Sequence, residues 1–336
     1  MTTKRFFAAL ALVGAAGLVA AVLFAIPARD FLFIPHKASP LSGYIRVQGA
    51  KQQQGKGDIY FVDVFIRRTS LLEQWLPFTR PDGATLVPEQ DYLPKGTSEA
   101  DNVTATEEEI QRSELVAPAV ALRALGYHVV TNPTGALVIG VAGDAPAAGK
   151  LREGDVIVAV DGVPVRTTAE VRKEIGKRKP GDKVTLTVRR GGEKVDLTMG
   201  TIPAPDDRTR PIVGIEVDQN ANIVLPRKVH IDLGAVRGPS AGLPFALEIA
   251  RKLGRNVTHG CRVAATGELD LEGDVLPVGG LKQKTIGARH THVDVFLVPA
   301  GENAKEARAN AGGLRIVPVR SFQQALHFLQ TAHLKC

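Results

Sequence analysis

The hydrophobic pattern begins with one unbroken apolar stretch and then changes to short alternating segments. Residues 6–26 carry no charge and follow Lys4 and Arg5. This length matches the roughly 20 residues that a helix needs to cross a bilayer, and the basic N-terminus favours the cytoplasm. We therefore expect residues 1–30 to form a transmembrane signal anchor, with the rest of the chain outside the cytoplasm. A signal peptide cleaved near Ala28 is the alternative, although its apolar core is normally about 7–15 residues long.

Alternating apolar and polar positions predict strands in the first and last thirds of the chain. They are expected over residues 44–47, 59–66, 213–217, 229–232, 261–266, 295–299 and 316–319. Apolar positions at helical spacing predict helices over residues 71–76, 106–125, 284–292 and 321–334. The second of these helices starts with a capping-box pattern at Thr106, and Pro118 kinks or breaks it. Residues 52–57 connect the first two strands and are expected to form a hairpin turn or short loop. Their glycines and lysine miss the spacing of a phosphate-binding loop.

The segment from Gly238 to Gly242 is small and turn-prone, and an apolar helix pattern follows it directly. It places Ser240 at a helix N-terminus, where free backbone N–H groups can stabilise an oxyanion. A serine N-cap after a glycine turn is the simpler alternative. Two further segments follow within about fifty residues: Thr266-Gly267-Glu268, and the run LPVGGLKQK that ends at Lys284.

In this order and at this spacing, the three segments resemble the proteolytic domain of the Lon (S16) family of serine proteases. The resemblance implies a serine–lysine dyad with Ser240 as the nucleophile and Lys284 as the general base. Thr266 matches the residue whose hydroxyl helps to hold that lysine. The turn at the serine, which also provides the oxyanion site, is then formed by Gly238, Pro239, Ala241 and Gly242.

A lysine can act as a base at neutral pH only if burial lowers its pKa. The apolar neighbours Val278, Leu281 and Ile286 can supply that burial, whereas Lys282 is expected to face solvent. The chain departs from the family pattern at two places. Arg237 stands where many Lon proteases carry an acidic residue, and Gln283 stands where glutamate is frequent.

The middle of the chain has a different pattern, which predicts short strands, glycine turns and one helix. The run from Pro146 to Gly162 resembles a PDZ domain of the kind attached to bacterial envelope proteases. The resemblance implies that this domain, residues 131–202, captures an extended peptide as an added strand. It implies a helix over 168–179, strands over 183–190 and 193–199, and a pairing strand over 136–141. The peptide-binding residues are then expected to be Thr134, Gly135, Ala136, Leu137, Val138 and Ile139, the first four as a loop with free N–H groups for a carboxylate.

Charge and cysteine content exclude several other classes of protein. The net charge is +7, but the basic residues are scattered and aromatic residues make up only 5% of the chain, so we expect no nucleic-acid partner. The two cysteines, Cys261 and Cys336, show no metal-binding spacing, and Cys261 is expected to be a buried free thiol. His290 and His292 lack an acidic partner at ligand spacing. We therefore expect no metal and no cofactor.

These patterns together predict an α+β protein with an N-terminal transmembrane helix. Residues 42–130 and 203–336 are expected to form one Lon-type α/β proteolytic domain, into which the PDZ β-sandwich or barrel of residues 131–202 is inserted. Domains are inserted where their own termini lie close together. The expected partners are protein or peptide substrates and a membrane, and the resemblance also allows a homo-oligomeric, hexameric ring.

The predicted function is that of an ATP-independent, membrane-anchored serine endopeptidase whose PDZ domain recognises substrate or regulates cleavage. One alternative is a non-catalytic PDZ adaptor whose protease domain is only a scaffold. The joint presence of Ser240, Thr266 and Lys284 favours the enzyme. A PDZ domain that only spaces the protease from the membrane is a further alternative. A protease that borrows a separate ATPase subunit is disfavoured, because the catalytic domain is expected outside the cytoplasm.

Overall fold

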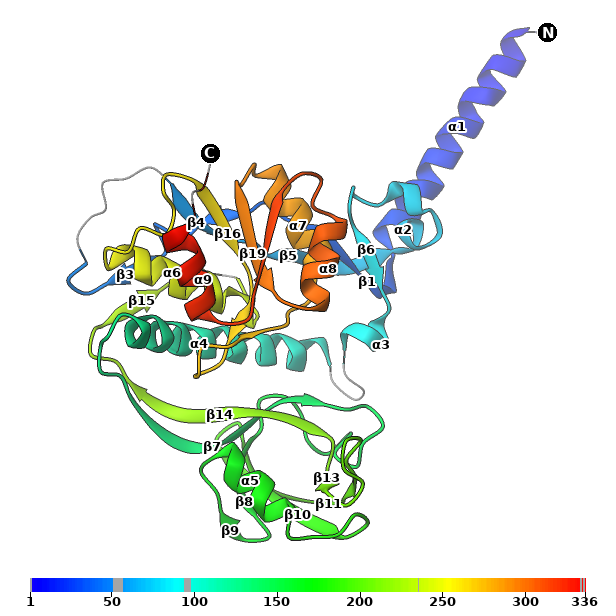
Figure 1. The fold of residues 1–336 in the computed structure, drawn as a ribbon. Coiled ribbons are helices and arrows are strands. Elements are labelled where there is room, and N and C mark those ends of the chain that lie inside the picture. The colour runs from blue at the N-terminus through cyan, green and yellow to red at the C-terminus, as the bar shows by residue number, and fades with distance from the viewer. Residues whose placement is uncertain (1, 51–56, 94–97, 235, 333, 335) are drawn as a thin grey trace.

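Two groups of elements follow a projecting N-terminal helix in the computed structural model of the chain (Figure 1). The larger group forms the upper body in this view and the smaller group a domain below it. The long helix α4 (Glu99–Ala124) lies between them. The structure describes residues 2–50, 57–93, 98–234, 236–332, 334 and 336. Of the turn expected at residues 52–57, residues 52–56 lie outside the described residues. The predicted mixed α+β class is confirmed.

The body is built on a five-stranded sheet whose inner strands are parallel. Its order is β2 (Ser39–Pro40), β4 (Asp58–Phe61), β16 (Arg262–Ala265), β19 (Val295–Pro299) and β20 (Arg315–Val319), with only β2 antiparallel to its neighbour. Side chains alternate between the two faces of a strand. Val263 and Leu297 therefore pack into one core and Ala264 and Phe296 into another. Both faces are buried, as parallel sheets require.

Helices cover the two faces of this sheet. The larger core contains residues of α4, α6 (Gly242–Lys252) and α9 (Phe322–Thr331), and it draws on segments both before and after the smaller domain. The second core contains residues of α7 (Leu281–His290) and α8 (Glu302–Ala309). The helices that carry the predicted dyad segments thus lie on opposite faces of one sheet.

Shorter elements complete the body. A three-stranded sheet has the order β5 (Val64–Ser70), β1 (Pro27–Pro35) and β6 (Thr85–Val87), β3 (Ile45–Val47) pairs with β15 (Val229–Ile231), and β17 (Glu268–Leu269) pairs with β18 (Val275–Leu276). The remaining helical turns are α2 (Leu71–Trp75), η1 (Pro77–Thr79), α3 (Glu89–Tyr92) and η2 (Pro239–Ala241). The strand expected over residues 59–66 is in fact two strands, because the chain leaves the parallel sheet after Phe61 and joins β1 from Val64.

The smaller domain has its own sheet and its own core. The strand order is β11 (Glu193–Gly200), β10 (Lys183–Arg190), β8 (Val156–Val160), β7 (Val130–Val141) and β14 (Ile215–Val224), and β9 (Val163–Pro164) pairs with β8. Helix α5 (Thr168–Ile175) packs its buried residues Val171 and Ile175 into this core. Strands β12 (Ile202–Pro203) and β13 (Pro211–Ile212) form a separate pair. The long β7–β14 ribbon leads back to the body (Figure 1).

Helix α4 begins earlier than its sequence pattern predicts. Ser98 is its N-cap and forms a reciprocal capping box with Asp101, whereas the expected cap, Thr106, lies inside the helix and bonds back to the Asn102 carbonyl. Two candidate capping boxes occur in succession here, and the upstream one starts the helix. Pro118 is accommodated within the helix, and Gly126, at a φ of 86°, follows its end.

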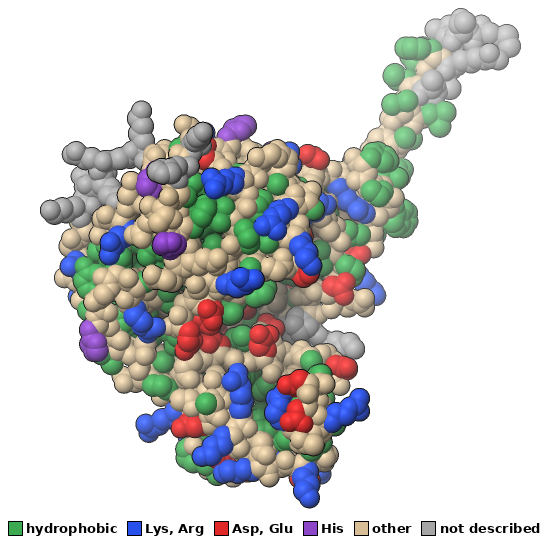
Figure 2. Space-filling model, in the orientation of Figure 1, with side chains coloured by type: hydrophobic (Ala, Val, Ile, Leu, Met, Phe, Trp, Pro, Cys, Tyr) green, Lys and Arg blue, Asp and Glu red, His purple; other side chains and the backbone are tan. Residues whose placement is uncertain are grey.

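Helix α1 (Thr2–Ala25) projects from the body, and apolar side chains such as Leu12 and Val13 are exposed on it (Figures 1 and 2). A membrane-crossing helix needs about 20 consecutive apolar residues. No helix within the described part of the chain is long and apolar enough to cross a membrane. The transmembrane anchor expected over residues 6–26 is therefore not supported.

The two cysteines form a disulfide, so the expectation that Cys261 is a free thiol was wrong. Cys261 lies directly before β16, and the Cα atoms of Cys261 and Cys336 are 5.5 Å apart across a separation of 75 residues. The sequence spacing could not predict this pairing, because it arises where the C-terminal segment returns to the start of β16.

Candidate active site

The predicted dyad segments meet at the carboxyl ends of the parallel strands. Thr266 directly follows β16, and its backbone N–H donates to the Leu297 carbonyl of β19 at 3.0 Å. Asp63 follows the carboxyl end of β4, on the same side of the sheet. In open α/β sheets the carboxyl ends of the strands are the usual place for a site, because the loops that leave the strands converge there.

Ser240 lies in the 3-10 turn η2, immediately before α6, and is half-buried. Gly238 precedes this turn at a φ of 89°, a conformation that glycine adopts without a steric penalty. The turn is held from two sides. The Gly238 N–H donates to the Thr106 carbonyl at 3.0 Å, and the Ser113 hydroxyl donates to the Pro239 carbonyl at 3.1 Å. Both acceptor and donor belong to α4, so this helix positions the nucleophile turn.

The backbone N–H groups of the turn are partly used within the fold. The Gly242 N–H donates to the Pro239 carbonyl and closes the 3-10 turn. Together with the Gly238 N–H, this bond uses two of the N–H groups that the sequence assigned to oxyanion stabilisation, and Pro239 has none. No side chain caps α6 at Ala241 in the described structure. The assignment of Gly238, Pro239, Ala241 and Gly242 to this role stays a prediction.

Lys284 lies in the first turn of α7, and only 5% of its surface is exposed. Burial lowers the pKa of this amine from 10.5 to about 7, while the nearby carboxylate of Asp63 acts in the opposite direction. The pKa falls because a charged ammonium loses its hydration in an apolar environment. A substantial fraction of this lysine is therefore neutral near pH 7, which is the form that can accept a proton.

A short chain of hydrogen bonds connects Lys284 to Ser240. The Lys284 Nζ donates to the Thr266 hydroxyl at 3.3 Å, and that hydroxyl donates to the Ser240 carbonyl at 3.3 Å. The Gly267 N–H donates to the same carbonyl at 2.9 Å. Thr266 is fully buried, so its hydroxyl needs these partners. The structure thus brings together all three residues that the Lon resemblance selected.

Two residues beside Lys284 are held by one threonine. The amide of Gln283 donates to the Thr85 hydroxyl at 2.7 Å, and Lys282 donates to the same atom at 3.1 Å. Lys282 is half-buried. The expectation that it faces solvent was therefore only partly right, because the loop around Thr85 packs over the start of α7.

Sequence reasoning missed Asp63 and its partner His36. The Nδ1 atom of His36 lies 2.9 Å from the Asp63 carboxylate, and this carboxylate favours the charged form of Lys284. The available signal was an acidic residue just after an apolar strand that leads into the parallel sheet. Arg237, the departure from the family pattern, pairs instead with Glu107 on α4, and both side chains are about half exposed.

Helix α7 can bury Lys284 only because glycine allows a close backbone approach. A Cβ atom on Gly287 would lie 1.9 Å from the His36 carbonyl oxygen. We expect Gly287→Ala to lower the free energy of unfolding by about 1–3 kcal/mol, since the backbone must move apart. Urea unfolding measures this loss.

Gly279→Ala is the matched control, because no atom lies within 4 Å of a Cβ at that position. A loss for Gly287→Ala no greater than that for Gly279→Ala would contradict the expected close approach.

The residues predicted to bind peptide lie in an inner strand. Thr134 to Ile139 belong to β7, which pairs with β14 along its length and with β8 at Ala136 and Leu137. The Gly135 N–H donates to the Arg166 carbonyl and the Val138 N–H to the Asp155 carbonyl. The prediction that this strand offers a free edge was wrong, because β14, which follows the domain in sequence, occupies it. The outer strands of the described sheet are β11 and β14 itself.

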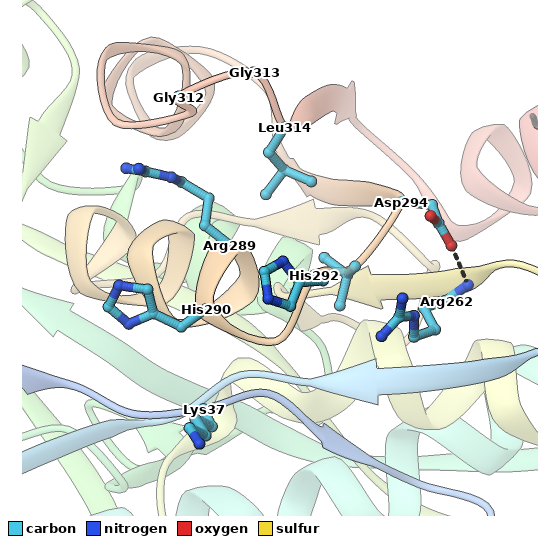
Figure 3. A pocket seen from close by; sticks show the side chains of 10 residues that line it. Lys37, Arg262, Arg289, His290, His292, Asp294, Gly312, Gly313 and Leu314 are labelled. Atoms are coloured by element: carbon cyan, nitrogen blue, oxygen red, sulfur yellow. Dashed lines mark hydrogen bonds between the residues drawn. The ribbon is translucent and has the colours of Figure 1, made fainter. Parts of the chain in front are cut away.

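An open surface cavity lies elsewhere in the described structure. It has a volume of about 830 Å³, and its lining includes Lys37, Arg262, Arg289, His290 and His292 (Figure 3). It lies at the amino ends of β16 and β19, and Asp294 accepts from the Arg262 N–H there. His290 and His292 thus line a basic surface cavity at the amino ends of the strands, whereas Lys284 lies at their carboxyl ends.

Two groups of side chains in the described structure bring three candidate metal ligands within 4.8 Å of one another. In the first, Cys261 and Cys336 are used in the disulfide beside Asp294. In the second, Asp218 is already paired with Arg112, which reduces the negative charge that Asp270 and Glu272 share with it. We assign no metal to either group.

Comparison with known proteins agrees with the two-part organisation. Residues 213–330 match the Lon protease (S16) C-terminal proteolytic domain, and residues 123–201 match the PDZ domain. The chain is 35% identical over 107 residues to "Lon protease" of Mesomycoplasma hyopneumoniae (strain 232) and 34% identical over 125 residues to "Lon protease 1" of Bacillus subtilis (strain 168). These matches cover 30% and 36% of this chain, but only 12% and 14% of the relatives.

Among solved structures, the PDZ domain of an SdrC-like protein from Listeria innocua is 28% identical. The match covers 25% of this chain and 92% of that one, with a TM-score of 0.23. The sequence matches, together with the Ser240–Thr266–Lys284 arrangement, support a protease. The chain therefore contains a Lon-type (S16) proteolytic segment and a PDZ domain.

Proposed function

We propose that the chain is a serine endopeptidase in which Ser240 is the nucleophile and Lys284 its general base. The observation that carries this proposal is the buried Lys284 amine, which has a pKa near 7 and is linked through Thr266 to Ser240. A serine hydroxyl is a poor nucleophile at neutral pH and needs an adjacent base. A neutral lysine in an apolar site provides one.

In this reaction the neutral Lys284 Nζ takes the proton from the Ser240 hydroxyl while Oγ bonds to the substrate carbonyl carbon. The carbonyl oxygen becomes an oxyanion, which backbone N–H groups at the start of α6 can stabilise. Lys284 then donates its proton to the leaving amine, and an ester to Ser240 remains. Water, deprotonated by the same amine, hydrolyses this ester and regenerates both residues. No step consumes ATP, in keeping with the lack of a phosphate-binding loop motif in the sequence.

Casein turnover by the purified chain without ATP tests the proposal, with Ser240→Ala as the control. The competing function, a PDZ adaptor with a scaffold-only protease domain, predicts equal turnover for the two proteins. The burial of Lys284 favours the enzyme. The desolvation of a buried amine costs free energy, and among the described residues Lys284 makes no salt bridge that would offset this cost in a scaffold.

The PDZ domain is proposed to recognise substrate through strand β14 rather than β7. An extended peptide adds to an exposed sheet edge, and β14 is one of the two outer strands of the described sheet. The start of α5 lies beside it, since the Thr168 N–H donates to the Gln219 side chain at 3.4 Å. Slower hydrogen exchange of β14 amides on addition of an extended peptide would support this site, and slower exchange confined to β7 would contradict it.

We also propose that the folded domains lie outside the cytoplasm. The Cys261–Cys336 disulfide supports this location, because structural disulfides persist mainly in oxidising compartments. The single-pass membrane location and the hexameric ring stay predictions. Cell fractionation and alkylation of the chain before and after reduction test the location, and cysteines that react without prior reduction would contradict it.

A further inference from the structure

Helix α4 contacts the nucleophile turn and the PDZ domain through different faces. One face holds the turn through the Thr106 carbonyl and the Ser113 hydroxyl. Another face, which includes Glu109, Arg112 and Val116, lines a cavity of about 310 Å³ against β7 and β14. Figure 1 shows the helix between the two domains along its length. The same helix therefore contacts both the PDZ ribbon and the turn that carries Ser240.

Arg112 is the only lysine or arginine among the described residues that line this cavity. Its guanidinium donates to the Asp218 carboxylate on β14 and to the Glu268 carboxylate on β17, the latter at 3.3 Å. All three side chains are largely buried, with 18% of Arg112, 9% of Asp218 and 18% of Glu268 exposed. A planar guanidinium can hold two carboxylates at once. One side chain thus joins the outer PDZ strand to the proteolytic body.

Glu268 belongs to a hairpin that lies in the sequence between Thr266 and Lys284. The β17–β18 hairpin starts just after Thr266 and leads into α7, which carries Lys284. Its base is packed tightly against the nucleophile turn. The Gly267 N–H donates to the Ser240 carbonyl, and a Cβ atom on Gly242 would lie 3.0 Å from the Leu269 nitrogen. A shift of this hairpin therefore shifts Thr266 relative to Ser240.

We propose that Arg112 is a positioning residue that couples strand β14 of the PDZ domain to the β17–β18 hairpin and, through it, to Thr266 and Lys284. The proposal rests on the proposed protease function and specifies how the PDZ domain regulates it. Peptide that adds to the outer edge of β14 acts on the strand that carries Asp218. Arg112 transmits the displacement to Glu268, so that occupancy of the PDZ domain and the geometry of the dyad change together.

The charges around Glu268 make this link depend on pH. Burial is the main cause that raises the pKa of Glu268 from 4.5 to about 7, and Arg112 opposes it. The other acidic groups that face Glu268 and raise its pKa are Asp218 on β14, Glu153 in the loop before β8, and Asp270 on its own hairpin. Glu109 on α4 faces the same cluster, and burial raises its pKa to about 7 as well. Figure 2 shows acidic side chains gathered where the two domains meet.

The direction of the pH effect follows from the protonation state in which Glu268 binds Arg112 best. Ionised Glu268 accepts a charge-assisted hydrogen bond, whereas protonated Glu268 makes a weaker one. The link is therefore strongest above about pH 7 and weakens as the pH falls below it. A purely structural contribution of Arg112 would change the free energy of unfolding with the titration of Glu268, whereas the proposed coupling also changes kcat of the folded chain.

The test compares kcat and KM for an unstructured peptide in the full-length wild type, Arg112→Gln, Glu268→Gln and the double variant. Arg112→Gln should lower kcat roughly 5- to 150-fold, the usual range of coupling between sites. The ratio of wild-type to variant kcat should increase as the pH rises through about 7. Glu268→Gln should remove that pH dependence, and the double variant should be no worse than Arg112→Gln alone, because Arg112→Gln already removes the contact to Glu268.

Arg178→Gln is the matched control. Arg178 has the same exposure, 18%, and pairs with Asp161 entirely within the PDZ domain. Its removal should leave kcat and the pH dependence unchanged. A wild-type to Arg112→Gln ratio that is constant with pH, or losses that multiply in the double variant, would overturn the proposal.

Hydrogen exchange provides a readout that needs no catalysis. In the full-length Arg112→Gln chain, amides of both β14 and the β17–β18 hairpin should exchange faster, whereas Arg178→Gln should affect the PDZ domain alone. Unchanged exchange in the hairpin would overturn the proposal whether or not the chain cleaves peptide. Faster hairpin exchange in a chain whose wild type cleaves nothing would instead refute the proposed protease function and leave the link between the domains intact.

Discussion

Replacing Ser240 or Lys284 by alanine is expected to reduce kcat/KM for casein or an unstructured peptide by roughly 10⁴-fold or more. Residues that form one catalytic unit lose nearly all of their effect when either is removed. The double variant should therefore be no less active than either single variant. Initial rates of the three purified proteins against wild type provide the measurement.

Lys282→Ala is the control for this experiment. Lys282 lies two residues from Lys284 and donates to Thr85, so its removal costs one partly exposed hydrogen bond. Most of the activity should remain. An inactive Lys282→Ala combined with an active Lys284→Ala would show that the base has been assigned to the wrong lysine.

The second large effect is expected from pH. Only neutral Lys284 can accept the serine proton, and burial lowers the pKa of this amine to about 7. The value of kcat/KM should therefore increase about tenfold per pH unit below pH 7 and level off above it. The comparison of wild type between pH 5 and 9 measures this profile, with circular dichroism as the check that the chain stays folded.

Asp63→Asn gives the profile a matched control. The Asp63 carboxylate favours charged Lys284, so its removal should lower the pKa of the amine and shift the midpoint of the profile to lower pH. A flat profile, or a midpoint near the ordinary lysine value of about 10.4, would contradict the role of Lys284 as a buried base.

The same titration predicts how stability changes with pH. In the unfolded chain the Lys284 pKa is near 10.5, and in the folded chain it is about 7. Between these values the unfolded chain binds the additional proton, so the Lys284 contribution makes the free energy of unfolding rise with pH across this window. Lys284→Met should remove that rise, which urea unfolding at several pH values measures.

Local sequence signals were sufficient for much of the fold and for the core of the site. The apolar pattern predicted β19 over residues 295–299, and the PDZ resemblance predicted β10 over 183–190, both with the bounds that the structure has. The glycine-rich turn and the two later segments selected Ser240, Thr266 and Lys284, which the structure brings together. These signals are local because side-chain period, turn residues and short motifs are all read within about ten residues.

What the sequence alone determined about this protein is therefore its α+β class, most of its strands and helices, and the identity of the residues at the candidate dyad. The tertiary structure decided which strand lies at the outer edge of the PDZ sheet, that Cys261 meets Cys336, and that Asp63 and Arg112 belong to the surroundings of the site. Each of these results depends on a contact between segments far apart in the chain. Such contacts leave no periodic trace in either segment, because their free energy arises only when packing brings the two segments together.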